Sequence, residues 1–269
     1  MGVPSSPVNP VMAVALNSIP QFWRYYSPSR GPIYQFWMGI RFFWFGLSLL
    51  RQSPRLQLTS VIPIVMTGGL FSGLTWLSGQ WARDLLSLIP ATLPAWLLTI
   101  LQTFSAGIVL LLATFFLFFP IMTVIAIPFR ELLAAQTERL LTGSSSEVAL
   151  PWWQVVGDVL RSLLFQVLVV VLSIGLTWFI PGVGSLLTVV ILVYVAGLDM
   201  VDPPLGQRGY LFPARLSFVL QRRMLMAGFG LMAVLLLAVP ILNLLILPIA
   251  SIGGSSLVIG VLGQDTLKP

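Results

Sequence analysis

The sequence contains no cysteine and no histidine among its 269 residues. Without cysteine the chain has no disulfide, no thiolate nucleophile and no thiolate metal ligand. Without histidine it also lacks imidazole ligands and the base of a Ser-His-Asp triad. Carboxylates are scarce as well, with eight Asp and Glu residues, most of them outside the apolar segments, so paired-acid hydrolysis has little support. The sequence therefore predicts a protein that is not an enzyme, with no catalytic residue, no cofactor and no metal site.

Charge of either sign is also rare, at 8% of the residues against about 25% in ordinary soluble domains. Hydrophobic residues make up 57%, and the mean hydropathy is +0.98. Four runs of more than 25 residues carry no charge at all, at 56–82, 85–129, 162–198 and 224–264. Each is longer than the roughly 20 residues that a spanning helix needs, and a charge at the centre of such a helix costs about 2.5–3.5 kcal/mol. These features predict an all-α integral membrane protein.

The charges that are present are mostly positive. The net charge is +6, and every basic residue except Lys268 is an arginine. The arginines lie at the ends of the apolar runs and form no continuous basic segment, so nucleic-acid binding is not predicted. Cations in such positions are typical of residues that face anionic headgroups and the cytoplasm. The lipid bilayer is therefore the first predicted partner.

The positions of charge, aromatic rings, proline and glycine predict one membrane domain at 19–258. In the first part of this domain, aromatic residues alternate with arginines, a pattern typical of a helix that lies in the membrane interface. The predicted segments, in chain order, are a flexible leader at 1–18, an interfacial helix at 19–50, spanning helices at 58–77 and 95–120, a helical extension to 141, hairpins at 162–198 and 224–258, and a tail at 259–269.

The two hairpins are predicted because proline and glycine interrupt the last two uncharged runs near their middle. Arms of about 15–18 residues rise about 22–27 Å, so each pair of arms would enter the bilayer and return on the same side. The predicted turn residues are Pro181, Gly182, Gly184, Pro240 and Pro248. Proline and glycine also occur in ordinary spanning helices, so full spans are the alternative.

The arginines predict an orientation too. With re-entrant hairpins, nearly all of them fall on one side, and only Arg83 lies opposite. The positive-inside rule then places the N-terminus in the cytoplasm. The plasma (inner) membrane is the default location, with an internal membrane as the alternative.

Three stretches, in order, resemble a known family. They are residues 127–136 (IPFRELLAAQ) leading to Leu141-Thr142-Gly143, residues 180–184 (IPGVG), and a C-terminal block from Asp202-Pro203-Pro204 to Gly253-Gly254. In these stretches the chain is similar to the CysZ-like sulfate permease family, part of the etoposide-induced membrane protein superfamily. The resemblance implies two long spanning helices, two hairpins that penetrate only part of the bilayer, a homo-oligomer and sulfate uptake.

The sulfate motif of that family is not preserved in this sequence. Bacterial members carry Gly-Leu/Ile-Arg-Arg at the mouth of the first spanning helix; counting back from Pro63, Gln57 and Leu58 occupy the arginine positions. Arg51 and Arg55 lie one to two turns earlier, and arginine forks and helix N-terminal N–H groups both favour an anion. We expect a displaced site for a small anion such as sulfate at Arg51, Arg55 and Gln57. The alternative is that both arginines anchor the helix at the headgroups.

Asn243 is the remaining predicted substrate-binding residue, because it is a polar side chain among apolar neighbours near the second hairpin turn. The alternative is local capping of the break at Pro240. Taken together, the sequence predicts a transporter or channel for a small anion such as sulfate. A non-transporting membrane scaffold of the same superfamily is the alternative, because a fold does not determine a function and the missing arginine pair favours it.

Overall fold

The computed structural model describes residues 27, 30–87, 94–145, 148–180, 182–238 and 240–265. These residues form helices and short connections, and no strand occurs among them. The all-α prediction is therefore confirmed. The predicted leader and the turn residue Pro181 lie outside the described residues.

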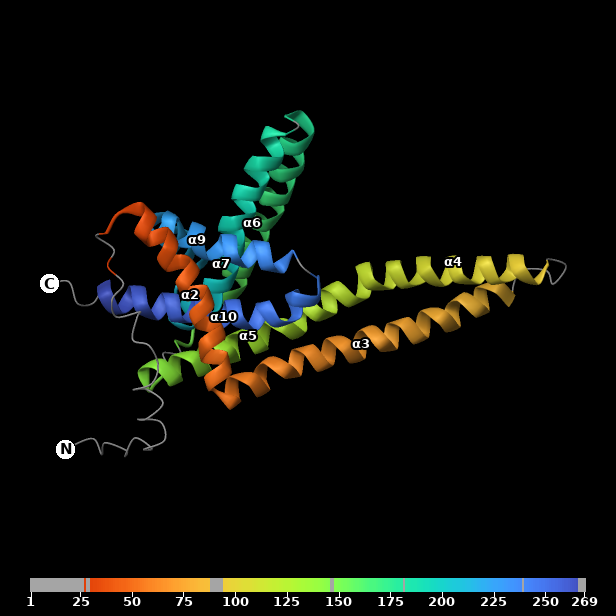
Figure 1. Cartoon of the computed structure of the whole chain (residues 1–269), viewed down its shortest axis with the longest axis horizontal. Coiled ribbons are helices and arrows are strands. Elements are labelled where there is room, and N and C mark those ends of the chain that lie inside the picture. The colour runs from red at the N-terminus through yellow and green to blue at the C-terminus, as the bar shows by residue number, and fades with distance from the viewer. Residues whose placement is uncertain are drawn as a thin grey trace. The chain divides into compact units, whose positions relative to one another are not determined.

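The chain forms a series of mostly long helices (Figure 1). In order they are α2 (Pro32–Gln52), α3 (Pro54–Ser87), α4 (Ala95–Ala113), a π-helical turn (Thr114–Phe118), α5 (Phe119–Thr142), α6 (Trp152–Phe179), α7 (Val183–Gln207), α8 (Phe212–Gln221), α9 (Arg223–Leu237) and α10 (Pro240–Asp265). The chain divides into a long-helix unit, Leu58–Phe129, and a bundle unit, which contains the residues up to Gln57 and from Arg130 onward.

Five of the described helical segments are long and apolar enough to cross a membrane. They are Pro54–Trp81, Ala95–Ala113, Trp152–Phe179, Val183–Gln207 and Ile246–Gly263. In addition, α8 and α9 follow one another with a bend of 99°. A chain with this many apolar helices is an integral membrane protein, because water cannot solvate such surfaces favourably.

The helices extend beyond the uncharged runs that predicted them. The sequence predicts the first hairpin at 162–198, whereas α6 begins at Trp152 and α7 continues to Gln207. The acidic side chains in these extensions pair with arginines on α5 and α8, as described below. α10 likewise continues past 258 to Asp265, since Ile259 and Val261 are buried in the bundle.

The long-helix unit contains α3 from Leu58, α4, the π-helical turn and the beginning of α5. Large apolar side chains are exposed along both of its long helices, among them Val65 and Trp76 on α3 and Phe104 and Leu111 on α4. Pro63 lies inside α3 without ending it, and the hydroxyl of Thr67 donates to the Pro63 carbonyl oxygen at 2.6 Å. Exposed apolar faces of this kind fit a lipid environment.

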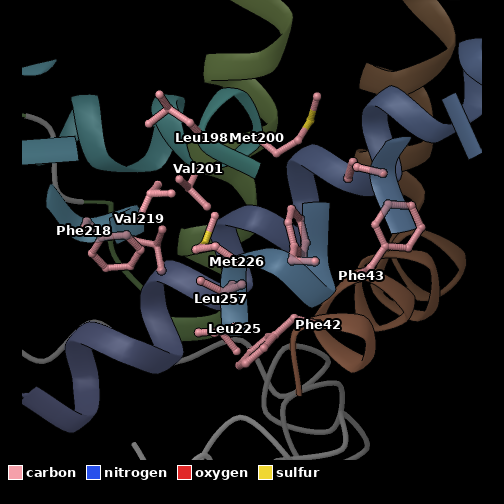
Figure 2. Packing of buried hydrophobic residues seen from close by; sticks show 14 of the residues in the cluster. Phe42, Phe43, Leu198, Met200, Val201, Phe218, Val219, Leu225, Met226 and Leu257 are labelled. Atoms are coloured by element: carbon pink, nitrogen blue, oxygen red, sulfur yellow. The ribbon is translucent and has the colours of Figure 1, made fainter. Parts of the chain in front are cut away.

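The core of the bundle unit lies where α2, α7, α8, α9 and α10 meet (Figure 2). Side chains from all five helices converge there, including Phe42, Met200, Phe218, Met226 and Leu257, each of them buried. This cluster holds together α7 and α8, which carry several of the charged residues described below.

Glycines allow the bundle helices to approach at backbone distance. A Cβ added to Gly228 on α9 would lie 2.0 Å from the carbonyl oxygen of Phe36 on α2. A Cβ on Gly39 of α2 would lie 2.1 Å from the carbonyl oxygen of Leu225 on α9. Small residues at such crossings are typical of helix packing in membranes. The α2–α9 contact therefore requires glycine from both helices.

Candidate functional site

The predicted anion site lies at the corner where α2 ends and α3 begins. Ser53 connects the two helices in an extended conformation, and Pro54 starts α3, a position where the missing N–H of proline costs nothing. Apolar packing holds the corner in place, because Leu49 and Leu56 are buried in a cluster with residues of α5 and α10. Its conformation is thus determined by packing in the bundle unit.

The corner brings two of the predicted residues together. Gln57 Nε2 donates to the carbonyl oxygen of Arg51 at 3.0 Å, and Gln57 N donates to the carbonyl oxygen of Ser53 at 3.1 Å. The amide of Gln57 therefore stabilises the corner itself. Arg51 in the last turn of α2 and Arg55 in the first turn of α3 are both exposed, so the two arginines lie on either side of the turn.

The other predicted residues lie in the last four helices or at their ends. Asn243 is in the first turn of α10, and its side chain is outside the described set, so its role stays a prediction. Gly182 precedes α7 with φ 88, and Gly184 packs so closely that a Cβ would lie 1.9 Å from the Leu176 carbonyl oxygen. Pro240 is the first residue of α10, whereas Pro248 is buried inside that helix.

A buried charge cluster that was not among the predicted sites joins α6, α7 and α8. Arg215 on α8 is at its centre: its guanidinium donates to Asp158 Oδ2 at 2.8 Å and to Asp202 Oδ1 at 2.7 Å. Its Nε also donates to the Tyr210 carbonyl oxygen at 2.6 Å. The side chains of Arg215 and Asp158 are only 11% and 8% exposed.

Asp158 has a second role in this cluster. Its Oδ1 accepts a hydrogen bond from the backbone N–H of Phe212, the first residue of α8. No side chain of α8's own N-terminal segment provides such a cap. A carboxylate at this position both satisfies an otherwise unpaired donor and interacts favourably with the helix dipole.

Two further ion pairs connect α5 to the end of α7 and its connection to α8. Arg130 pairs with Asp199 at 3.1 Å, and Arg208 pairs with Glu138 at 2.7 Å. Gln207 Nε2 adds a hydrogen bond to the Glu131 carbonyl oxygen at 2.7 Å. Burial lowers the pKa of Arg208 from its ordinary value, and the neighbouring Glu138 carboxylate opposes that shift.

The cluster changes the interpretation of the arginines at the ends of the apolar runs. Arg130, Arg208 and Arg215 are paired with carboxylates on other segments and are therefore not available to an incoming anion. A signal for this was present in the sequence, because the acids and these arginines share the charged segments between uncharged runs. Asp158 lies with Arg130 in the segment 130–161, and Asp199 and Asp202 lie with Arg208 and Arg215 in the segment 199–223. Which acid pairs with which arginine depends on tertiary packing and is not readable from spacing.

Apolar helices with internally paired charges at their ends define a polytopic α-helical membrane protein. The chain belongs to the family described as sulfate transporter CysZ/etoposide-induced protein 2.4, which matches residues 42–248.

Relatives named sulfate transporter CysZ are similar over most of their length. The protein of Vibrio cholerae (El Tor Inaba N16961) is 30% identical over 240 residues, covering 81% of this chain and 92% of the relative. That of Pseudomonas fluorescens (Pf0-1) is 27% identical over 223 residues, covering 79% and 88%. That of Pectobacterium atrosepticum is 28% identical over 234 residues, covering 81% and 83%.

Proposed function

We propose that this protein transports sulfate or a similar small anion across a bacterial inner membrane, with its N-terminus in the cytoplasm, and has no catalytic activity. The proposal is supported by family membership and by relatives named sulfate transporter CysZ that align with about four fifths of the chain. The observation in the structure that carries it is the α2–α3 corner, where two exposed arginines flank the start of a long apolar helix.

Sulfate suits this corner for a chemical reason. A tetrahedral dianion is bound well by arginine forks and by the N–H groups at a helix start. Arg51 and Arg55 provide the arginine forks, and the beginning of α3 provides the N–H groups of a helix start. Gln57 stabilises the turn between them through its bond to the Arg51 carbonyl oxygen. We assign the two arginines to substrate binding and Gln57 to positioning, with Asn243 as a further contact along the path.

Sulfate binding to purified protein tests this site. Replacing Arg51 and Arg55 together with glutamine should weaken binding of radiolabelled sulfate at least tenfold, because hydrogen bonds to charged groups contribute about 1.5–3 kcal/mol each. Arg139→Gln and Arg161→Gln, which remove two exposed arginines elsewhere, form the matched control. Equal binding by the two double variants would contradict the assignment.

We also propose that α6 and α7 form a hairpin that penetrates only part of the bilayer. The tip carries Trp178 and Phe179, which are 82% and 88% exposed, and no charge lies between Arg161 and Asp199. A tip that emerged into water would be expected to carry polar side chains. From Arg161 to Phe179 the helix rises about 27 Å, which is slightly less than the roughly 30 Å hydrocarbon core.

Cysteine accessibility can test the hairpin, since the natural chain has no cysteine. A cysteine at Val183, next to the turn, should remain unlabelled by a membrane-impermeant maleimide added to either side of a vesicle. Ser144→Cys, in the connection after α5, should be labelled from the cytoplasmic side, and Arg83→Cys from the opposite side. Labelling of Val183→Cys from the same side as Arg83→Cys would establish a full span instead.

A non-transporting scaffold is the second candidate function. It is favoured by the absence of the family's arginine motif before Pro63, where Gln57 and Leu58 stand. Homo-oligomer formation, which we also propose, fits either function because the exposed apolar side chains of α6, such as Leu164 and Val171, suit a second copy as well as lipid. A protein that forms oligomers and binds no sulfate would support the scaffold.

A further inference from the structure

One face of α2 carries an exposed row of side chains that no function above uses. Ile33, Trp37, Arg41 and Trp44 are spaced by four, four and three residues, so they lie on the same side of the helix. Residues Trp37 and Trp44 are 59% and 47% exposed, and Arg41 lies one turn from each of them. We call Trp37, Arg41 and Trp44 the α2 stripe.

The opposite face of α2 holds the stripe in place. Gly39 and Gly46 pack against the backbones of α9 and α10, where added Cβ atoms would lie 2.1 Å and 2.3 Å from carbonyl oxygens of Leu225 and Ile249. The Trp44 ring contacts the buried ring of Phe43 edge to face, with centroids 5.9 Å apart. The stripe is therefore presented outward by a helix that has little freedom to rotate.

The charge of the stripe is not compensated within the described structure. No described residue forms an ion pair or hydrogen bond with the Arg41 side chain. The first Asp or Glu along the chain is Asp84, so α2 and the segment before it contain arginine but no carboxylate. A ligand that matches this surface must bring its own negative charge.

The composition of α2 indicates where that ligand is located. Among the described helices, α2 is not one of those apolar enough to cross a membrane, although it has 21 residues. Exposed tryptophans are typical of the membrane–water boundary, where the ring is apolar and the N–H seeks an acceptor. A helix with this composition lies along the boundary, where phospholipid headgroups are the abundant anions.

We propose that the α2 stripe binds the headgroup of an anionic phospholipid. The Arg41 guanidinium donates to the phosphate, while the two indoles flank the glycerol region and donate from their N–H groups to ester oxygens. Anionic lipids are preferred over zwitterionic ones because the latter carry a cation that Arg41 repels. The inference does not depend on transport, since it concerns a surface away from the α2–α3 corner.

Native mass spectrometry of the purified protein tests the proposal, with phosphatidylglycerol and phosphatidylcholine of identical acyl chains as probes. Arg41→Gln should bind phosphatidylglycerol about fivefold more weakly and phosphatidylcholine unchanged, since one arginine near a membrane surface contributes about 1 kcal/mol. Arg41→Lys keeps the charge and should keep most of the preference. Arg139→Gln, which removes an exposed arginine hydrogen-bonded to Ser145 after α5, should behave as wild type.

Three results would overturn the proposal. The first is an Arg41→Gln protein that retains the preference for phosphatidylglycerol. The second is an equal loss in Arg139→Gln, which would indicate a general charge effect. The third is displacement of phosphatidylglycerol by inorganic sulfate at constant ionic strength, which would assign the α2 stripe to the substrate anion. Arg41 is exposed, so its replacement leaves the packing of α2 intact.

Discussion

Replacing Arg215 with leucine is expected to lower the free energy of unfolding by about 3–5 kcal/mol, the cost of removing one partner from a buried ion pair. The guanidinium joins Asp158 on α6 to Asp202 on α7, and its loss leaves the Asp158 carboxylate almost fully buried without a cation. Unfolding in mixed detergent and dodecyl sulfate micelles, followed by circular dichroism, measures this change.

The control for this prediction is Arg161→Leu, which removes an exposed arginine from α6. Its effect should stay within about 0.5 kcal/mol, as for most surface substitutions. The double variant Arg215→Leu with Asp158→Asn should recover part of the stability, because a neutral amide oxygen still accepts from Phe212 N–H without leaving a buried charge. If Arg215→Leu is as stable as Arg161→Leu, the cluster does not hold these helices together.

Replacing Gly228 with alanine should destabilise the protein by about 3 kcal/mol, at the upper end of overpacking costs. The added methyl group would lie 2.0 Å from the carbonyl oxygen of Phe36, a backbone atom that cannot move without separating α2 from α9. The same unfolding assay measures the effect.

Gly73→Ala in α3 provides the matched control for the glycine prediction. No atom lies within 4 Å of a Cβ placed there, so the substitution only reduces backbone freedom within a helix. It should stabilise the protein by about 0.5–1 kcal/mol. Opposite signs for the two alanine variants are expected, and destabilisation of similar size in both would refute the close α2–α9 contact.

The helices were predictable from sequence because the bilayer imposes a simple rule on charge. Uncharged runs longer than about 20 residues indicate apolar helices, and the runs at 56–82 and 162–198 lie within α3 and within the α6–α7 hairpin. Helix ends were less predictable, since Trp152 and Gln207 lie beyond the runs. The helical structure of these two ends depends on contacts that appear only after folding. Asp158 pairs with Arg215 near the start of α6, and Gln207 donates to the Glu131 carbonyl oxygen of α5 at the end of α7.

The candidate site was predictable only in part. Proximity along the chain was enough to place Arg51, Arg55 and Gln57 at one corner, because they lie within two helical turns of one another. The bond from Gln57 to the Arg51 carbonyl oxygen was not foreseen, since it depends on the extended conformation of Ser53. The partners of Arg215 were even less accessible to sequence reasoning, because Asp158 lies 57 positions away.

Sulfate uptake into liposomes that contain the purified protein tests the central claim most directly. We expect uptake of radiolabelled sulfate above that of empty liposomes, with a loss of at least tenfold when Arg51 and Arg55 are both replaced by alanine while the folded state is retained. Uptake by folded wild-type protein that equals the empty-liposome level would contradict the transport account and favour the scaffold. If uptake is unchanged in the double variant, the protein is a transporter, but its anion site is not at the α2–α3 corner.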